Sequence, residues 1–497
     1  MKKKTLLVGA LSCLCVGTVF STYHPPKAGA TMNDMDTPLV SPMFAPDLFK
    51  PDFAHDKVGA EKWAKEHYKK WSESLPSGQI KSLNELKTPD NPENYDINRE
   101  LKFTGGDINR LPSDVPALKD QLKLDIDRID KALSHKEGKT PNKMYVYKDM
   151  KLPDLNNMKD EDLIDPTHPY KIDTGKLKEF KNNFDYGILS DYLIVNLSER
   201  EGGNNGILKW KIELPASTNA GHLDEDRLVL QRNTGLEING VTIINQKGKE
   251  YIRINAKLVT RDKIDERIKR TQSDLNKSWN EALGLPESTE FIKFEVNDRY
   301  ASSVSEGARS MVHEMASNVS NDLIKNVASY MVEKKGGFIF TDIGLRHVPE
   351  AYAPKPPVMY TLDKFDNMKG IYNPFNRTII MQGPSAFKEG YYGMNTDILT
   401  HEFGHVVDHY LGHFIYEGIT ISSLKEFGDI VDIEGNNLTE YGQESKLEFF
   451  AEAFMMMHSS NPEIRAKVEQ NAPQTFKFIS DRIKDIGSTP STVLVSK

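Results

Sequence analysis

Residues 400–408 read THEFGHVVD, with two histidines four positions apart and a glutamate directly after the first. Residues four apart lie on one face of an α-helix, so His401 and His405 can both turn toward one metal ion. Imidazole nitrogens bind Zn²⁺ at about 2.0–2.1 Å. Glu402 can face a metal-bound water and act as its general base. The pattern predicts a zinc site, and a helix with purely structural histidines is the alternative.

The flanking residues favour a buried helix around this pattern. Asn395 or Thr396 can cap its amino end, Asp397 lies in its first turn, and Gly412 can end it. The remaining positions are mostly apolar and predict burial against a core: Ile398, Leu399, Phe403, Val406 and Val407.

The third metal ligand is expected from a later helix. A catalytic zinc keeps three protein ligands and one open position, and the only cysteines, Cys13 and Cys15, lie near the amino end. Residues 444–458 read ESKLEFFAEAFMMMH and place Glu448 and Glu452 four apart among apolar residues. Such carboxylates are costly to bury unless they are paired or metal-bound. We expect Glu448 to bind the ion and Glu452 to orient a histidine ring, and a solvated acidic stripe is the alternative.

Further polar residues lie close to these motifs in sequence. Tyr441 precedes Glu448 by seven residues, and its phenol could donate to the oxyanion of a tetrahedral intermediate. Asp408 is expected to orient a ligand rather than bind the ion, with a plain surface acid as the alternative. Three other histidines have spacings that suit a ligand less well, and we expect them to be structural or exposed: His409, His413 and His458.

The amino terminus predicts export. Lysines at positions 2–4 precede an uncharged, mostly apolar run over 5–20, and residues 28–30 read AGA, a cleavage pattern. We predict a signal peptide over 1–30 and a secreted, extracellular protein. A membrane anchor is the alternative, although the run is shorter than the roughly 20 residues that a span needs. Cleavage would change the formal net charge from −8 to −12, which argues against nucleic acid and against an anionic membrane surface as the main partner. No second candidate span follows, so we expect no integral membrane segment in the mature chain.

The 497 residues are too many for one ordinary domain, and the composition, 38% hydrophobic, is that of a globular protein. We predict an α+β protein with a linker over 31–52, a first domain over 53–265, a helical connector over 266–300 and a second domain over 301–490. Residues 53–74 have helical periodicity. Short apolar or β-branched runs predict strands in the first domain at 144–147, 207–213, 227–231, 241–245 and 251–258.

The second domain resembles the catalytic domain of the anthrax lethal factor family, and more distantly the Pro-Pro endopeptidases. Four stretches carry this resemblance: HEFGHVVDHYLG at 401–412, NNLTEYG at 436–442, LEFFAEAFMMMHSS at 447–460 and NAPQTFKFISDRIK at 471–484. The resemblance implies a mainly helical zincin-like metallopeptidase domain with a small sheet.

The resemblance also implies roles for single residues. His401, His405 and Glu448 would bind one Zn²⁺, and Glu402 would be the catalytic acid and base. Tyr441 would assist transition-state stabilisation, and Glu452 would lie outside the ligand set. An extended substrate would add to an edge strand formed by Thr378, Ile379, Ile380 and Met381.

The first domain resembles the ADP-ribosyltransferase fold of bacterial binary toxins. The order of its segments carries the resemblance: a helix with Trp63 and Trp71, then ENYDINREL at 93–101, MYVYKDM at 144–150 and HLDEDRLVLQR at 222–232. The residues at the positions that carry the family's transferase chemistry differ in this chain, however. Lys148 stands in place of an arginine, residues 188–190 read ILS in place of STS, and residues 225–227 read EDR in place of Glu-x-Glu.

An arginine at position 227 cannot stabilise an oxocarbenium-like transition state as a carboxylate does, so we expect no transferase activity. We expect residues 53–265 to dock a separate pore-forming translocation component or to help select substrate, with an inert scaffold as the alternative. The whole chain is then a toxin-like zinc endopeptidase delivered into host cells. The alternatives are an extracellular, non-toxin peptidase of the Pro-Pro endopeptidase type, and a binding protein with a residual ADP-ribosyltransferase fold.

Overall fold

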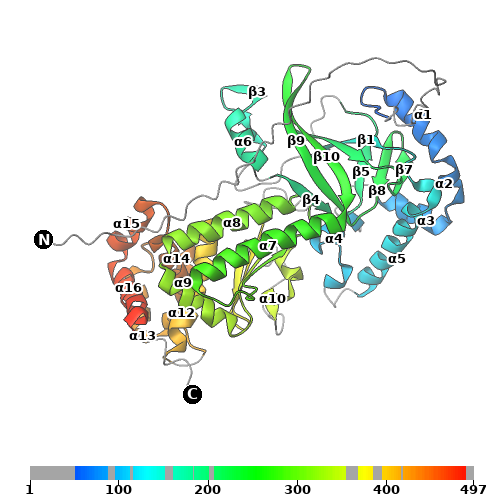
Figure 1. The fold of residues 1–497 in the computed structure, drawn as a ribbon. Coiled ribbons are helices and arrows are strands. Elements are labelled where there is room, and N and C mark those ends of the chain that lie inside the picture. The colour runs from blue at the N-terminus through cyan, green and yellow to red at the C-terminus, as the bar shows by residue number, and fades with distance from the viewer. Residues whose placement is uncertain are drawn as a thin grey trace, which may run out of the picture. The chain divides into compact units, whose positions relative to one another are not determined.

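A computed structural model describes residues 51–488, except for 88–95, 112–115, 151–159, 183, 201–205, 354–367, 384–393 and 416–417. The predicted signal peptide, and the predicted linker up to residue 50, lie outside the described residues. None of the described helices is long and apolar enough to cross a membrane. The described residues combine helices with two larger sheets, which confirms the predicted α+β class (Figure 1).

An eight-stranded sheet occupies the first half of the described chain, with the order β4-β9-β10-β6-β1-β5-β8-β7. Its pairs are antiparallel except for β6 and β10. All five predicted strands belong to it. Its strands are β1 (Met144–Met150), β4 (Tyr186–Leu189), β5 (Leu193–Asn196), β6 (Leu208–Leu214), β7 (Ala220–Asp224), β8 (Arg227–Leu230), β9 (Thr234–Gln246) and β10 (Lys249–Thr260).

Helices precede and connect the strands of this sheet, and the predicted helix over 53–74 is broken at Tyr68 into two. Trp71 is buried, and its indole N–H donates to Ala132 O at 2.8 Å, which ties the second helix to the fifth. These elements are α1 (Lys57–His67), α2 (Lys69–Ser74), α3 (Ser77–Glu85), α4 (Ile97–Phe103), α5 (Pro116–Leu133) and α6 (Thr174–Asn182), with a small hairpin of β2 (Ile164–Asp165) and β3 (His168–Ile172).

A four-stranded sheet forms the framework of the second half, with the order β11-β12-β14-β13. The first three strands are parallel, and the last is antiparallel. Ile339 and Ile380 face a small apolar cluster with Val348, whereas their strand neighbours face the main core, as period-two alternation requires. The strands are β11 (Ile292–Glu295), β12 (Phe338–Thr341), β13 (Gly370–Asn373) and β14 (Thr378–Gln382).

Helices pack against this sheet, and α7 runs alongside α8 (Figure 1). The helix with the histidines, α12, contacts α8, α9, β13 and β14 and packs most extensively on α14. The helices are α7 (Arg261–Leu283), α8 (Ala301–Asn318), α9 (Asn321–Val332), α10 (Pro349–Tyr352), α12 (Thr396–His413), α13 (Lys425–Glu434), α14 (Lys446–Met457), α15 (Pro462–Asn471) and α16 (Pro473–Ser488).

The prediction that Thr378, Ile379, Ile380 and Met381 form an edge strand is wrong. These residues belong to β14, which pairs with β12 on one side and with β13 on the other. All five residues of β14 are buried, as is typical of an apolar strand paired along both edges. Among the described residues, β13 pairs with β14 alone, so β13 is the outer strand on this side.

The opposite edge of the small sheet is covered by side chains from α7. Asn276 Oδ1 accepts from Phe291 N–H at 2.9 Å and from Ile292 N–H at 2.8 Å. Gln272 Oε1 accepts from Phe294 N–H at 2.8 Å. These contacts satisfy the backbone groups that an edge strand would otherwise present to another chain.

A buried carboxylate fixes the last helix. Glu434, which is 3% exposed, accepts from the backbone N–H groups of Gln474 and Thr475, both at 2.9 Å, and from the Thr475 hydroxyl at 2.7 Å. It therefore satisfies amide groups in the first turn of α16 that have no partner within that helix.

Replacing Glu434 by alanine should lower the free energy of unfolding by about 1.5–3 kcal/mol, because hydrogen bonds to a buried charged group are lost together. Denaturant titration followed by circular dichroism measures this change. Glu469→Ala is the control, because Glu469 is exposed on α15. A loss no larger than the control's would contradict the capping role.

A buried ion pair joins the first half, which holds the eight-stranded sheet, to the second half, which holds the four-stranded sheet. Arg299, just before α8, donates from Nη2 to both carboxylate oxygens of Asp191 at 2.9 and 3.0 Å. Ile188 N–H in β4 donates to Asp298 O at 2.9 Å. A Cβ added at Gly187 would lie 2.2 Å from Arg299 O, so only glycine allows this backbone approach.

Candidate metal centre

The helix α12 begins at a side-chain cap. Asn395 is the cap residue, and its Oδ1 accepts from Asp397 N–H at 2.7 Å. The helix ends at His413, one residue beyond the predicted end at Gly412. A Cβ at Gly412 would lie 2.1 Å from Ile419 O, so this glycine permits close approach of the following segment rather than ending the helix.

Three predicted ligands converge. Glu448 Oε2 lies 3.1 Å from His401 Nε2 and 3.4 Å from His405 Nε2. One ligand atom from each of the three residues lies within 4.8 Å of the others, and this is the one such cluster found among the described residues. In a tetrahedral zinc site with zinc–ligand bonds of about 2.0–2.1 Å, two ligand atoms lie about 3.3–3.4 Å apart. The donor atoms therefore suit a zinc ion in chemistry, and the two nitrogen–oxygen separations are close to this spacing.

Close packing of α14 on α12 brings Glu448 to the histidines. Ser445 Oγ caps α14 by accepting from Glu448 N–H at 3.1 Å. A Cβ at Gly404 would lie 3.1 Å from Ala451 Cα, so glycine lets the two helices approach closely. Glu452, one turn after Glu448, places Oε1 2.8 Å from His401 Nδ1. The other ring nitrogen of His401 is then directed toward the centre of the cluster.

The charges of the cluster are strongly coupled. Burial lowers the pKa of His401, but the carboxylates of Glu448 and Glu452 outweigh it and raise that pKa to about 9. Burial raises the pKa of Glu448, but His401 and His405 outweigh it and hold that pKa well below its ordinary value. The carboxylate of Glu448 therefore stays ionised, which suits a ligand of a divalent cation.

Glu402 follows His401 in α12 and takes no part in the hydrogen bonds that join the histidines to Glu448 and Glu452. It is 8% exposed, and burial, together with the nearby Glu448, raises its pKa. The backbone N–H of Tyr372 in β13 donates to its carboxylate. The strand β13 thus positions Glu402. This contact has no local pattern in the sequence, because it joins segments about 30 residues apart.

Tyr441 lies on the exposed side of the cluster. Its side chain is 50% exposed, and its ring centroid lies 5.6 Å from that of His401. Burial and the carboxylates of Glu448 and Glu402 raise the pKa of its phenol above the ordinary value. The phenol keeps its proton and can donate a hydrogen bond beside the ligands.

Asp408 is buried but hydrogen-bonded elsewhere. Its Oδ1 accepts from Ser422 N–H at 2.8 Å, and burial raises its pKa to about 6. Asp408 Oδ2 and His405 Nδ1 are both buried without a hydrogen-bond partner among the described residues. The three histidines expected outside the ligand set lie elsewhere: His409 against His405 O, His458 against Asn318 O, and His413 against the Tyr330 ring.

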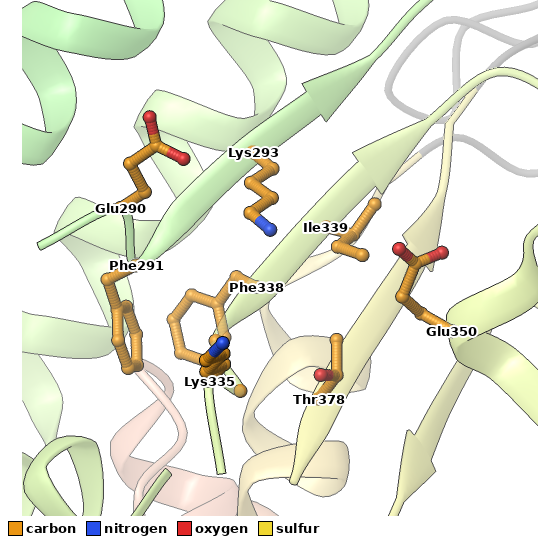
Figure 2. Close-up of a pocket in the computed structure, with 10 residues that line it drawn as sticks. Glu290, Phe291, Lys293, Lys335, Phe338, Ile339, Glu350 and Thr378 are labelled. Atoms are coloured by element: carbon orange, nitrogen blue, oxygen red, sulfur yellow. The ribbon is translucent and has the colours of Figure 1, made fainter. Parts of the chain in front are cut away.

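Two hollows in the described chain lie apart from these ligands. One is a cavity of about 20 Å³ at the start of β12 and β14. Figure 2 shows the residues that line it, among them Lys293, Lys335, Glu290 and Glu350. A wider hollow of about 480 Å³ beside β1 is lined mainly by charged residues. None of the cluster residues lines either of them.

Comparison with known protein families gave matches over most of the chain. Residues 80–259 match the family model "Anthrax toxin lethal factor, middle domain", and residues 247–482 match "Anthrax toxin lethal factor, N- and C-terminal domain". Lethal factor of Bacillus anthracis is 44% identical over 395 residues, which are 79% of this chain and 48% of the relative. The chain thus spans about half the length of this relative.

Solved structures of ADP-ribosylating toxins also match. BECa of a Clostridium perfringens binary enterotoxin has 19% identity and a TM-score of 0.37 over 48% of this chain and 57% of that one. Plx2a of Paenibacillus larvae has 22% identity and a TM-score of 0.34 over 42% of this chain and 99% of that one.

Proposed function

Because residues 80–482 belong to the anthrax toxin lethal factor family, we propose that this protein is a secreted, toxin-like zinc endopeptidase that hydrolyses peptide bonds of protein substrates. The observation that carries the proposal is the convergence of His401, His405 and Glu448, with the buried carboxylate of Glu402 beside them. A single buried histidine or glutamate would not indicate a metal site, but the three side chains together provide three ligands with a carboxylate base beside them.

His401, His405 and Glu448 would hold one zinc ion, and Glu452 would orient the His401 ring. Bound zinc supplies Lewis-acid chemistry, polarising the scissile carbonyl and making water more acidic. Glu402 takes a proton from the attacking water and passes it to the leaving amine. The phenol of Tyr441 donates a hydrogen bond to the developing oxyanion.

An extended substrate would add to β13. This strand lies against α12, and its Tyr372 N–H contacts the Glu402 carboxylate. The opposite edge of the sheet, at β11, is covered by Asn276 and Gln272 of α7. A peptide that pairs with β13 would therefore pass the general base, which supports β-strand addition as the binding mode.

The first half, 53–265, would act as a binding module rather than a transferase. The acidic residues around 224–226 are already engaged: Asp224 pairs with Arg227, Glu225 with Lys57 at 3.0 Å, and Asp226 accepts from Ser198. We propose that this half docks a translocation component that carries the enzyme into host cells. Docking of residues 31–265 to a co-secreted pore-forming protein would support this proposal.

Removing the metal should abolish hydrolysis. Dialysis against a strong chelator should lower the rate of cleavage of a proteome-derived peptide library to below roughly a tenth of its original value, because the ion held by His401, His405 and Glu448 would supply the Lewis-acid chemistry. About one equivalent of Zn²⁺ per chain should restore it. Mass spectrometry of the products would identify the cleavage site. A zinc-loaded protein that cleaves no peptide in the library would favour a binding protein with an inert metal site.

A further inference from the structure

The first residue of β13 lies against the proposed general base. Gly370 is paired with Met381 across the sheet. A Cβ added at Gly370 would lie 3.0 Å from Met381 Sδ and 3.1 Å from both Cγ and Oε1 of Glu402. These distances are shorter than the about 3.5–4.0 Å at which non-bonded carbon atoms pack best. A side chain at this position must therefore displace one of the two neighbours.

Glu402 is the neighbour whose displacement would affect catalysis. Its carboxylate also accepts from the backbone N–H of Tyr372 in the same strand. Gly370 and Tyr372 are two residues apart, so their Cβ positions face the same side of β13. One residue donates to the carboxylate, and the other leaves space for it. The added Cβ would contact the Glu402 side chain and not its backbone, so a shift of that side chain by a few tenths of an ångström would relieve the contact without unfolding the strand.

We propose that Gly370 is a positioning residue, whose missing side chain lets Glu402 occupy the place from which it takes the proton. This inference rests on the proposed peptidase function. Catalytic groups must be held within about 0.5 Å of their productive geometry, and a misplacement of about 1 Å can cost about a hundredfold in rate. The backbone of β13, which would pair with the substrate, keeps its N–H and C=O groups in a Gly370→Ala variant.

Gly370→Ala should lower kcat about tenfold or more, with KM within about twofold, zinc content unchanged and the thermal midpoint close to that of the wild type. The matched control is Gly240→Ala in β9, where an added Cβ would meet only Asn255 Nδ2, at 3.9 Å. The control should keep wild-type kcat and KM. A larger residue, as in Gly370→Val, should lower kcat further.

Crystal structures of the wild type and Gly370→Ala with zinc give a readout that does not depend on turnover. We expect the Glu402 carboxylate to be displaced in the variant while the three ligands stay in place. An unmoved carboxylate, a wild-type kcat, or loss of zinc or of the fold would overturn the positioning role. If the wild type itself cleaves nothing, the peptidase function fails, and the carboxylate position still tests Gly370.

Discussion

Glu402→Gln is expected to lower kcat/KM for peptide hydrolysis at least about a hundredfold while leaving the fold and the zinc in place. General base catalysis contributes typically 10²–10⁴-fold, and an amide cannot accept the proton. Burial raises the pKa of Glu402 from its ordinary value, which makes the carboxylate a better base near neutral pH. The amide oxygen of glutamine can still accept from Tyr372 N–H, so the loss would be chemical rather than structural.

The measurement is a comparison of kcat/KM on one peptide selected from the library, with metal content and thermal midpoint determined for the same preparations. Glu469→Gln is the matched control because it makes the same substitution at an exposed position of α15, away from the cluster. Near-normal turnover by Glu402→Gln, with zinc bound, would show that another group takes the proton and would refute the assignment.

Local pattern was sufficient to predict the centre of the candidate site. His401 and His405 share a helical face because the helix repeats every 3.6 residues, and the apolar residues around Glu448 predict that its helix is buried. The structure brings these three residues together. The strands at 207–213 and 251–258 were recognisable for the same reason, because β-branched and apolar runs bounded by turn residues depend only on neighbours in sequence.

The order of the strands in the small sheet could not be predicted from local sequence patterns. The run of residues 378–381 identifies a strand, but whether it lies at an edge depends on the partner β13, a four-residue strand with little pattern of its own. The contact of Gly370 with Glu402 follows from that pairing and was equally hidden. Glycine in sequence indicates only a missing side chain, and the reason for it lies in the structure.

Another non-local feature is the buried ion pair that joins the two halves. Asp191 and Arg299 are 108 positions apart, with side chains 5% and 8% exposed, and Lys102 Nζ lies 3.6 Å from Asp191. Burial raises the pKa of Asp191, but Arg299 and Lys102 outweigh it and hold that pKa below its ordinary value. The stability that the pair contributes is therefore present above about pH 4 and is lost as the pH falls through the lowered pKa.

Asp191→Ala should lower the free energy of unfolding by up to about 3–5 kcal/mol, because it leaves the buried Arg299 with the more distant carboxylate of Asp298, at 3.7 Å, beside Lys102 and Lys148. Burial, Arg299 and Lys102 already lower the pKa of Lys148 to about 8, so the carboxylate offsets a local excess of positive charge. Denaturant titration followed by tryptophan fluorescence measures the loss. Asp429→Ala, which breaks the exposed pair with Lys425, is the control and should change stability little.

A double variant tests the role of this charge pair. Asp191→Leu combined with Arg299→Met removes both of its charges but leaves the nearby carboxylate of Asp298, 3.7 Å from Arg299 in the wild type, so it should be more stable than Asp191→Ala. If Asp191→Ala unfolds like the Asp429→Ala control, water must reach Arg299 easily, and the two halves are not held by this pair. If the double variant is as unstable as the single one, removing the Asp191–Arg299 charge pair as a whole does not restore stability, and Arg299 is needed for other contacts, including that with Asp298.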